Sequence, residues 1–89
     1  MATSAAFVPI VRQRLSDQLV HRIWASIEDG QLRAGDQLPP ILAMAREFRV
    51  AAATVREALM KLEAKHLVEI RHGAGVFIAS GVGHHTTER

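Results

Sequence analysis

VAAATVREA, residues 50–58, opens with alanines and continues into a threonine and an arginine one helical turn later. The apolar residues that follow recur three and four positions apart, at Val55, Ala58, Leu59 and Leu62. This spacing predicts an amphipathic helix from about Ala52 to Lys65 with one buried stripe. The surrounding sequence decides whether the start of this helix belongs to a core or lies exposed to bind a partner.

A second, short helix is expected immediately before it. Pro40 is well suited to the first turn of a helix, and Met44, Ala45 and Phe48 form its apolar side. Only a tight connection through Arg49 and Val50 separates the two helices. Because the short helix is marginal alone, we expect it to pack across the longer one, in a helix-turn-helix that leaves the start of the longer helix projecting outward.

After His66 the apolar residues recur at every second position, which is the spacing of a β-strand and not of a helix. LVEIRHGAGVFIA predicts two short strands, 67–71 and 76–79, joined by a turn that contains Gly73 and Gly75. Three helices followed by a β-hairpin make a mainly α fold with a small β-hairpin. The expected architecture is therefore a winged helix-turn-helix.

The first helix is expected from its apolar stripe, with Ser16 as its N-cap and Gly30 just beyond its end; the stripe contains Leu15, Leu19, Ile23 and Ile27. A loop follows, with a short extended piece at residues 36–38. Residues 1–12, which include Pro9, show no helical period and are interpreted as an N-terminal arm. The expected organisation is an arm at 1–12, the winged helix-turn-helix domain at 13–79, and a flexible tail or the start of an interdomain linker at 80–89.

Composition narrows the function without naming it. The chain has 89 residues, a formal net charge of +2 and no cysteine, so one small domain in a reducing compartment is expected. No apolar run approaches the roughly 20 residues of a membrane span, and no nucleophile, metal or phosphate-loop motif is present. We therefore expect a cytoplasmic protein that is not an enzyme, has no cofactor or metal, and does not bind membranes.

Three short motifs give a more specific indication. Leu38-Pro39, the run TVREAL at 54–59 and the pattern Gly73-x-Gly75-x-Phe77 together resemble the DNA-binding domain of the gluconate-repressor (GntR) family of bacterial transcription regulators. The resemblance covers roughly residues 15–79. It implies the sequence-specific DNA-binding module of a repressor. In the full-length regulator this module works as part of a homodimer. The resemblance implies a small-molecule effector only if a C-terminal domain exists outside this chain.

The resemblance also implies a set of DNA-contacting residues. It assigns Thr54 and Arg56 to the DNA-facing side of the recognition helix in the major groove, with Ala52 and Ala53 on the same face. His72 and Gly73 would form the wing tip in the adjacent minor groove. An arginine can bind phosphate or guanine through its forked guanidinium, and a glycine lets the backbone approach DNA closely.

The chain departs from the family pattern at several positions. Leu42 replaces an arginine, Ala51-Ala52 replaces a Ser-Arg pair, Ile41 replaces a glutamate, and Arg49 and His66 replace glycines. Arg49 is therefore either held at positive φ, or the turn has changed shape and Arg49 supplies an extra phosphate contact.

An apolar patch results from these departures. It contains Leu42, Ala52 and Ala53, with Ile41 beside them. The alanines could contact thymine methyl groups, or the patch could bind a protein, or Ile41 and Leu42 could fold under the N-terminal arm. The alternative function is accordingly a degenerate winged helix that acts as a protein–protein interaction module through its alanine-rich face.

Overall fold

The computed structural model describes the backbone of residues 2–80 and the side chains of residues 10–80. Three helices precede a two-stranded antiparallel hairpin; the elements are α1 (Ala2–Glu28), α2 (Ile41–Phe48), α3 (Ala52–Ala64), β1 (Val68–Arg71) and β2 (Gly75–Ile78). The predicted fold is confirmed. The second and third helices and the strands agree with the expected bounds to within about one residue.

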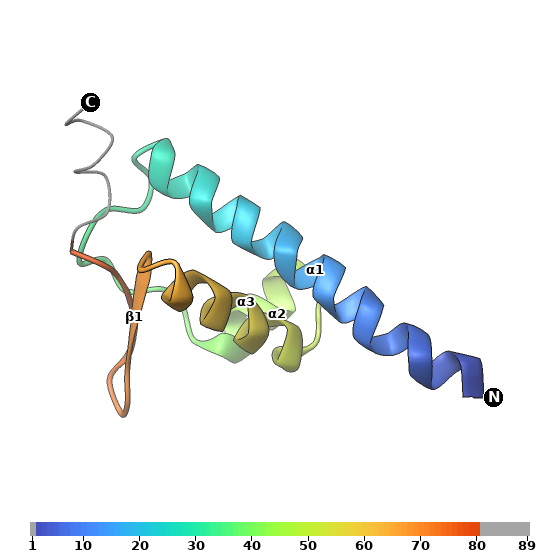
Figure 1. The fold of residues 1–89 in the computed structure, drawn as a ribbon. Helices are drawn as coiled ribbons and strands as arrows, with labels where there is room; N and C mark the ends of the chain where they lie inside the picture. Colours follow the sequence, from blue (N-terminus) through green and yellow to red (C-terminus); the bar gives the residue numbers. More distant parts are fainter. Residues whose placement is uncertain (1, 81–89) are drawn as a thin grey trace.

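The core lies where α1 and α3 pack against each other, with α2 and the hairpin closing its other sides (Figure 1). The central side chains are Val55, Leu59 and Leu62 of α3, which are almost fully buried. The predicted stripes of the first and third helices are buried, apart from Leu15, which is only half-buried; Met44 of α2 and Ile78 of β2 complete the same cluster. Phe48, Val50 and Trp24 are half-buried at the edge of this core and pack against it.

Helix α1 begins much earlier than expected. It starts at Ala2, so residues 2–12 belong to a helix and not to an irregular arm, and its N-terminal part extends beyond the rest of the fold (Figure 1). The prediction that Ser16 caps the helix is wrong. Ser16 lies within α1, is fully buried, and its Oγ donates a hydrogen bond to the carbonyl of Gln13 at 2.9 Å. Serine has this alternative to capping inside a helix, because its hydroxyl can bond a carbonyl one turn back.

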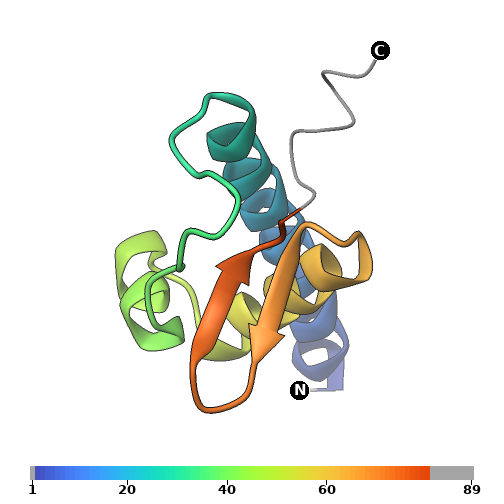
Figure 2. The same cartoon turned by 90° about the vertical axis from the view of Figure 1, so that its left-hand side faces the viewer.

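The hairpin forms the wing and is supported by the segment before α2 (Figure 2). Val68 pairs with Ile78 and Arg71 with Gly75, and Gln37 forms an isolated antiparallel bridge to Phe77. The backbone N–H of Leu38 donates to the carbonyl of Val76 at 2.8 Å. The predicted extended piece at 36–38 is thus confirmed, and it fixes the base of the wing to the start of α2.

The remaining expectations about the ends of the chain are tested only in part. Residues 81–89 of the expected tail lie outside the described residues, so the division at residue 80 stays a prediction. Although α1 has 27 residues, no described helix has the continuous apolar length needed to cross a bilayer.

Candidate nucleic-acid interface

The turn between α2 and α3 keeps the geometry that a glycine would favour, although its residue is an arginine. Arg49 ends α2 with φ 60° and ψ 47°, in the left-handed region, and its N–H donates to the carbonyl of Ala45. The N–H of Val50 donates to the same carbonyl at 3.0 Å. Of the two conformations left open by the sequence, the positive φ is therefore correct, and the phosphate contact of Arg49 stays a prediction. The side chain of Arg49 is exposed beside the start of α3.

Helix α3 starts without a side-chain cap. Ala51 is the N-cap residue with an extended backbone (φ −69°, ψ 150°), and no side chain accepts a hydrogen bond from the first turn. Ala52 and Ala53 are half-exposed there, and the first turn contains no acidic residue. The start of α3 therefore presents methyl groups and backbone N–H groups instead of the polar cap and arginine of the family pattern.

Thr54 and Arg56, the two residues of α3 that the resemblance assigned to the DNA-facing side, have different environments. Arg56 is exposed, as predicted, and no carboxylate pairs with it among the side chains of residues 10–80. Thr54 is only 3% exposed, so the expectation that its side chain faces outward is wrong. Thr54 precedes the fully buried Ala58 by four residues and so lies on the same face of the helix, which packs towards α1.

The outward face of α3 contains one residue that the sequence analysis missed. Ala53, Arg56 and Met60 are three and four residues apart, so they share the face opposite the buried stripe. Met60 is 63% exposed, which is unusual for a side chain of its size and polarity. The signal was present in the sequence, because Met60 falls outside the 55–58–59–62 stripe.

The wing tip presents the residues that the resemblance assigned to it. His72 and Gly73 are both exposed in the turn, where Gly73 has φ +79°. Gln37 stabilises the turn, because its Nε2 donates a hydrogen bond to the carbonyl of Ala74 at 3.0 Å. In Figure 1 the hairpin loop and the start of α3 lie on the same side of the molecule, away from the C-terminal half of α1.

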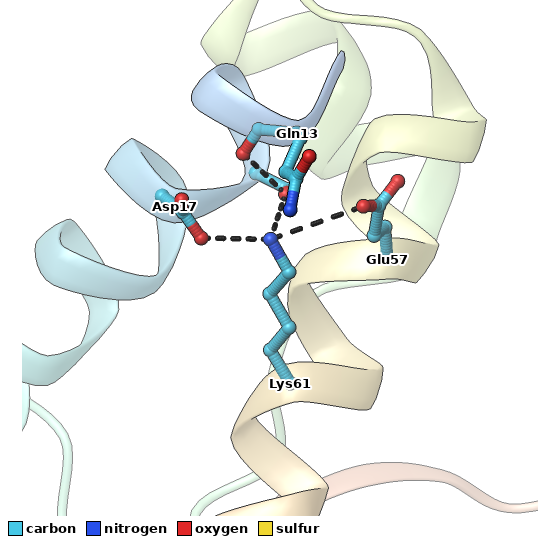
Figure 3. A network of polar contacts seen from close by, with 5 residues as sticks. Gln13, Asp17, Glu57 and Lys61 are labelled. Atoms are coloured by element: carbon cyan, nitrogen blue, oxygen red, sulfur yellow. Dashed lines mark hydrogen bonds and ion pairs between the residues drawn. The ribbon is translucent and has the colours of Figure 1, made fainter. Parts of the chain in front are cut away.

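A polar cluster fixes α3 against α1 (Figure 3). The Nζ of Lys61 lies 2.8 Å from the Oγ of the buried Ser16, 2.7 Å from Oδ1 of Asp17 and 3.8 Å from Oε2 of Glu57. The carboxylate of Glu57 is thereby paired with Lys61. This cluster joins residues about 45 positions apart, and it holds the outward face of α3 in a defined orientation relative to α1.

Leu42 completes the apolar patch expected from the sequence. It is 65% exposed, so it does not fold under the N-terminal part of the chain; that alternative is wrong for Leu42, while Ile41 is half-buried against the core. Leu42 lines a groove of about 550 Å³ between the first turn of α2 and the wing, together with His72 and Gly73. Of the apolar patch, Ile41 and Leu42 therefore share one surface with the wing tip.

Comparison with known proteins agrees with this geometry. Residues 15–78 match the family of bacterial regulatory proteins, gntR family. The Exu regulon transcriptional regulator of Escherichia coli K12 is 37% identical over 73 residues, which are 82% of this chain and 28% of that protein. A transcriptional regulator from Oenococcus oeni has a similar structure, with a TM-score of 0.75, 30% identity, and coverage of 82% of this chain and 61% of that one.

The DNA-binding domain of AraR in complex with its operator ORR3 is also similar, with a TM-score of 0.70 and 25% identity over 73% of this chain and 78% of that one. The chain spans about a quarter to a third of the length of the curated relatives it matches. These relatives are transcriptional regulators and not enzymes. The chain belongs to the gntR family of bacterial regulatory proteins and has the winged helix-turn-helix fold of that family's DNA-binding domain.

Proposed function

We propose that this chain binds double-stranded DNA sequence-specifically, with α3 in the major groove and the wing tip in the adjacent minor groove. The observation that carries the proposal is the exposed side chain of Arg56 on the outward face of α3, which has no carboxylate partner among residues 10–80. An arginine in this position can form a bidentate contact with guanine, and such a contact contributes roughly 1–3 kcal/mol of discrimination.

The neighbouring residues have supporting roles in this proposal. Ala52 and Ala53 allow the start of α3 to approach the base edges closely and contact thymine methyl groups. Arg49 lies at the turn before α3 and supplies a phosphate contact, while His72 and Gly73 enter the minor groove. Thr54 is not part of this interface, because its side chain is buried.

The regulatory setting is part of the same proposal. We propose that the chain acts as the DNA-binding module of a cytoplasmic repressor that binds its operator as a homodimer. A single domain with few phosphate contacts binds DNA weakly, with a nonspecific Kd of about 10⁻⁴ to 10⁻⁶ M at physiological salt. Two joined domains on two half-sites overcome this weakness. A small-molecule effector would act through a further domain, as the greater length of the relatives allows.

A salt series of gel-shift titrations tests the proposal. Wild-type chain should bind duplexes of random sequence, and the logarithm of the affinity should fall against the logarithm of salt concentration with a slope of about −2 to −4, as expected for two to four phosphate contacts. Ala52→Arg adds a cation to the start of α3 and should strengthen binding. Absence of binding at about 50 mM salt, where phosphate contacts are strong, would exclude a DNA-binding role.

A protein–protein interaction module is the second candidate. It is favoured by the exposed Leu42, which lines the groove between α2 and the wing with an apolar side chain where a phosphate-binding surface would have a polar one. The same titration separates the two functions, because a protein-binding winged helix would show no salt-dependent affinity for DNA.

A further inference from the structure

The loop that joins the two strands of the wing (the wing loop, residues 72–74) is exposed throughout, and the hairpin side chains that join the core lie further along the strands. The N–H of Ala74 donates to the carbonyl of Arg71 at 3.0 Å, which closes the loop but does not fix it relative to the helices. A two-stranded hairpin is only marginally stable on its own. The orientation of the wing loop relative to α3 therefore depends on contacts from outside the hairpin.

Gln37 makes such a contact from the segment that precedes α2. Its backbone forms the isolated bridge to Phe77, and the two side chains of an antiparallel pair lie on the same face. Gly75, two positions before Phe77, is on that face as well. The side chain of Gln37 extends past Gly75, and its Nε2 donates to the carbonyl of Ala74 at 3.0 Å. Among the residues that the structure describes, this is the one hydrogen bond that joins the wing loop to a segment outside the hairpin.

Gly75 leaves the space that this contact requires. A β-carbon at position 75 would lie 2.5 Å from Nε2 of Gln37, which is closer than β-carbons approach other heavy atoms. Any other residue would therefore push the amide of Gln37 away from Ala74. Gly75 also has φ +129°, a conformation that glycine adopts without steric cost.

The backbone of Gln37 is anchored to the rest of the fold. The next residue, Leu38, is 5% exposed, and its N–H donates to the carbonyl of Val76 at 2.8 Å. Helix α2 begins three residues later, at Ile41, and packs against α3. Figure 2 shows the segment before α2 beside β2. Gln37 therefore connects the wing loop to the helix-turn-helix by a short, hydrogen-bonded path.

We propose that Gln37 is a positioning residue for DNA recognition, whose amide holds the wing loop in the orientation that lets α3 and the wing tip enter adjacent grooves. This inference rests on the proposed DNA-binding function and adds to it a residue that acts through the wing loop. With the amide bound to Ala74, His72 and Gly73 are ordered before DNA binds. Without it, binding has to order the loop, which lowers the affinity although no contact with DNA is lost.

Gln37→Met tests the contact in the free chain, because methionine has a similar length but no donor for the carbonyl of Ala74. The backbone ¹⁵N order parameters of residues 72–74 should fall from about 0.8 to below about 0.6, the range of a flexible loop. Gln31→Met is the matched control, since Gln31 is an exposed glutamine that lines the groove between α1 and α2. It should leave these order parameters unchanged. Both variants should keep the Tm within about 4 °C of wild type, because one exposed hydrogen bond contributes little to stability.

Binding is measured on a duplex that the wild-type chain selects from a random-sequence library at about 50 mM salt. Gln37→Met should lower the affinity by about 5- to 30-fold, as expected when one more residue has to be ordered on binding, and Gln31→Met should bind like wild type. In double-mutant cycles, the loss from Gln37→Met should shrink when His72→Ala has already removed a contact of the wing tip. It should stay the same in the Arg56→Ala background, because Arg56 lies on α3. Damage to the whole fold would not distinguish the two backgrounds.

The failure of this inference differs from the failure of the proposed function. Gln37 does not position the wing loop for DNA if Gln37→Met leaves the loop ordered, leaves the affinity unchanged, or loses affinity equally in the two backgrounds. DNA binding stands in each of these cases as long as Arg56→Ala weakens it. If the wild-type chain selects no site and Arg56→Ala leaves its DNA affinity unchanged, the proposed function fails and the inference fails with it.

Discussion

Replacing Arg49 by glycine should stabilise the fold and weaken DNA binding at the same time. Arg49 has φ 60° and ψ 47°, a conformation that costs a residue with a β-carbon roughly 1–2 kcal/mol relative to glycine. Glycine loses about 0.5–1 kcal/mol of this advantage through its greater freedom in the unfolded chain. The net gain in the free energy of unfolding should therefore be about 0.5–1 kcal/mol.

For a domain of this size, that gain corresponds to a Tm increase of about 2–8 °C. Circular dichroism on heating measures it directly. In the proposed complex Arg49→Gly also removes a phosphate contact, so the salt slope of DNA binding should become less negative by about 0.9.

His66 provides a matched control. It has nearly the same conformation, with φ 62°, but it lies at the far end of α3 from Arg49. His66→Gly should therefore raise the Tm by a similar amount and leave the salt slope unchanged. If neither glycine variant is more stable than wild type, the left-handed conformations do not carry the expected cost. If Arg49→Gly is more stable but binds DNA with an unchanged slope, Arg49 does not contact phosphate.

Two further substitutions test how α3 is held. Lys61→Met keeps the aliphatic stem but removes the ammonium that joins Ser16, Asp17 and Glu57, so the free energy of unfolding measured in urea should fall by about 1–2 kcal/mol. Lys65→Met, at an exposed position outside this cluster, should change it by less than about 0.5 kcal/mol, and equal losses in the two variants would rule out a specific role for the cluster. Ala51→Ser supplies the missing N-cap of α3 and should raise the free energy of unfolding by about 1 kcal/mol; an unchanged urea midpoint would mean that water already satisfies the first turn.

The parts of the fold that follow from local patterns could be predicted from the sequence. The stripe from Val55 to Leu62 and the alternation in the two strands each depend on neighbours within a few positions, so they identified α3 and the wing correctly. The family's glycine at the position of Arg49 made a positive φ one of two alternatives, and the backbone has kept that conformation.

The parts that depend on distant segments could not be predicted in the same way. Thr54 is buried on the side of α3 that packs towards α1, and Ser16 is buried where α1 meets Lys61, about 45 residues away in sequence. The sequence immediately around Thr54 or Ser16 gives no sign of the distant segment that packs against it. The early start of α1 was missed because Pro9 and the absence of an apolar stripe outweighed the helical propensity of the alanines.

The most direct measurement of the central claim compares Arg56→Ala with Arg14→Ala. Both variants lose one exposed positive charge, but Arg14 lies on the outer face of α1, opposite the stripe that packs on α3. On a duplex selected by the wild-type chain, Arg56→Ala should lower the affinity by about 5- to 150-fold, the equivalent of one lost guanine contact, and relax the preference at one base pair. Arg14→Ala should change the affinity by less than about twofold. Equal affinities of wild type and Arg56→Ala for that duplex would contradict the assignment of α3 as the recognition helix.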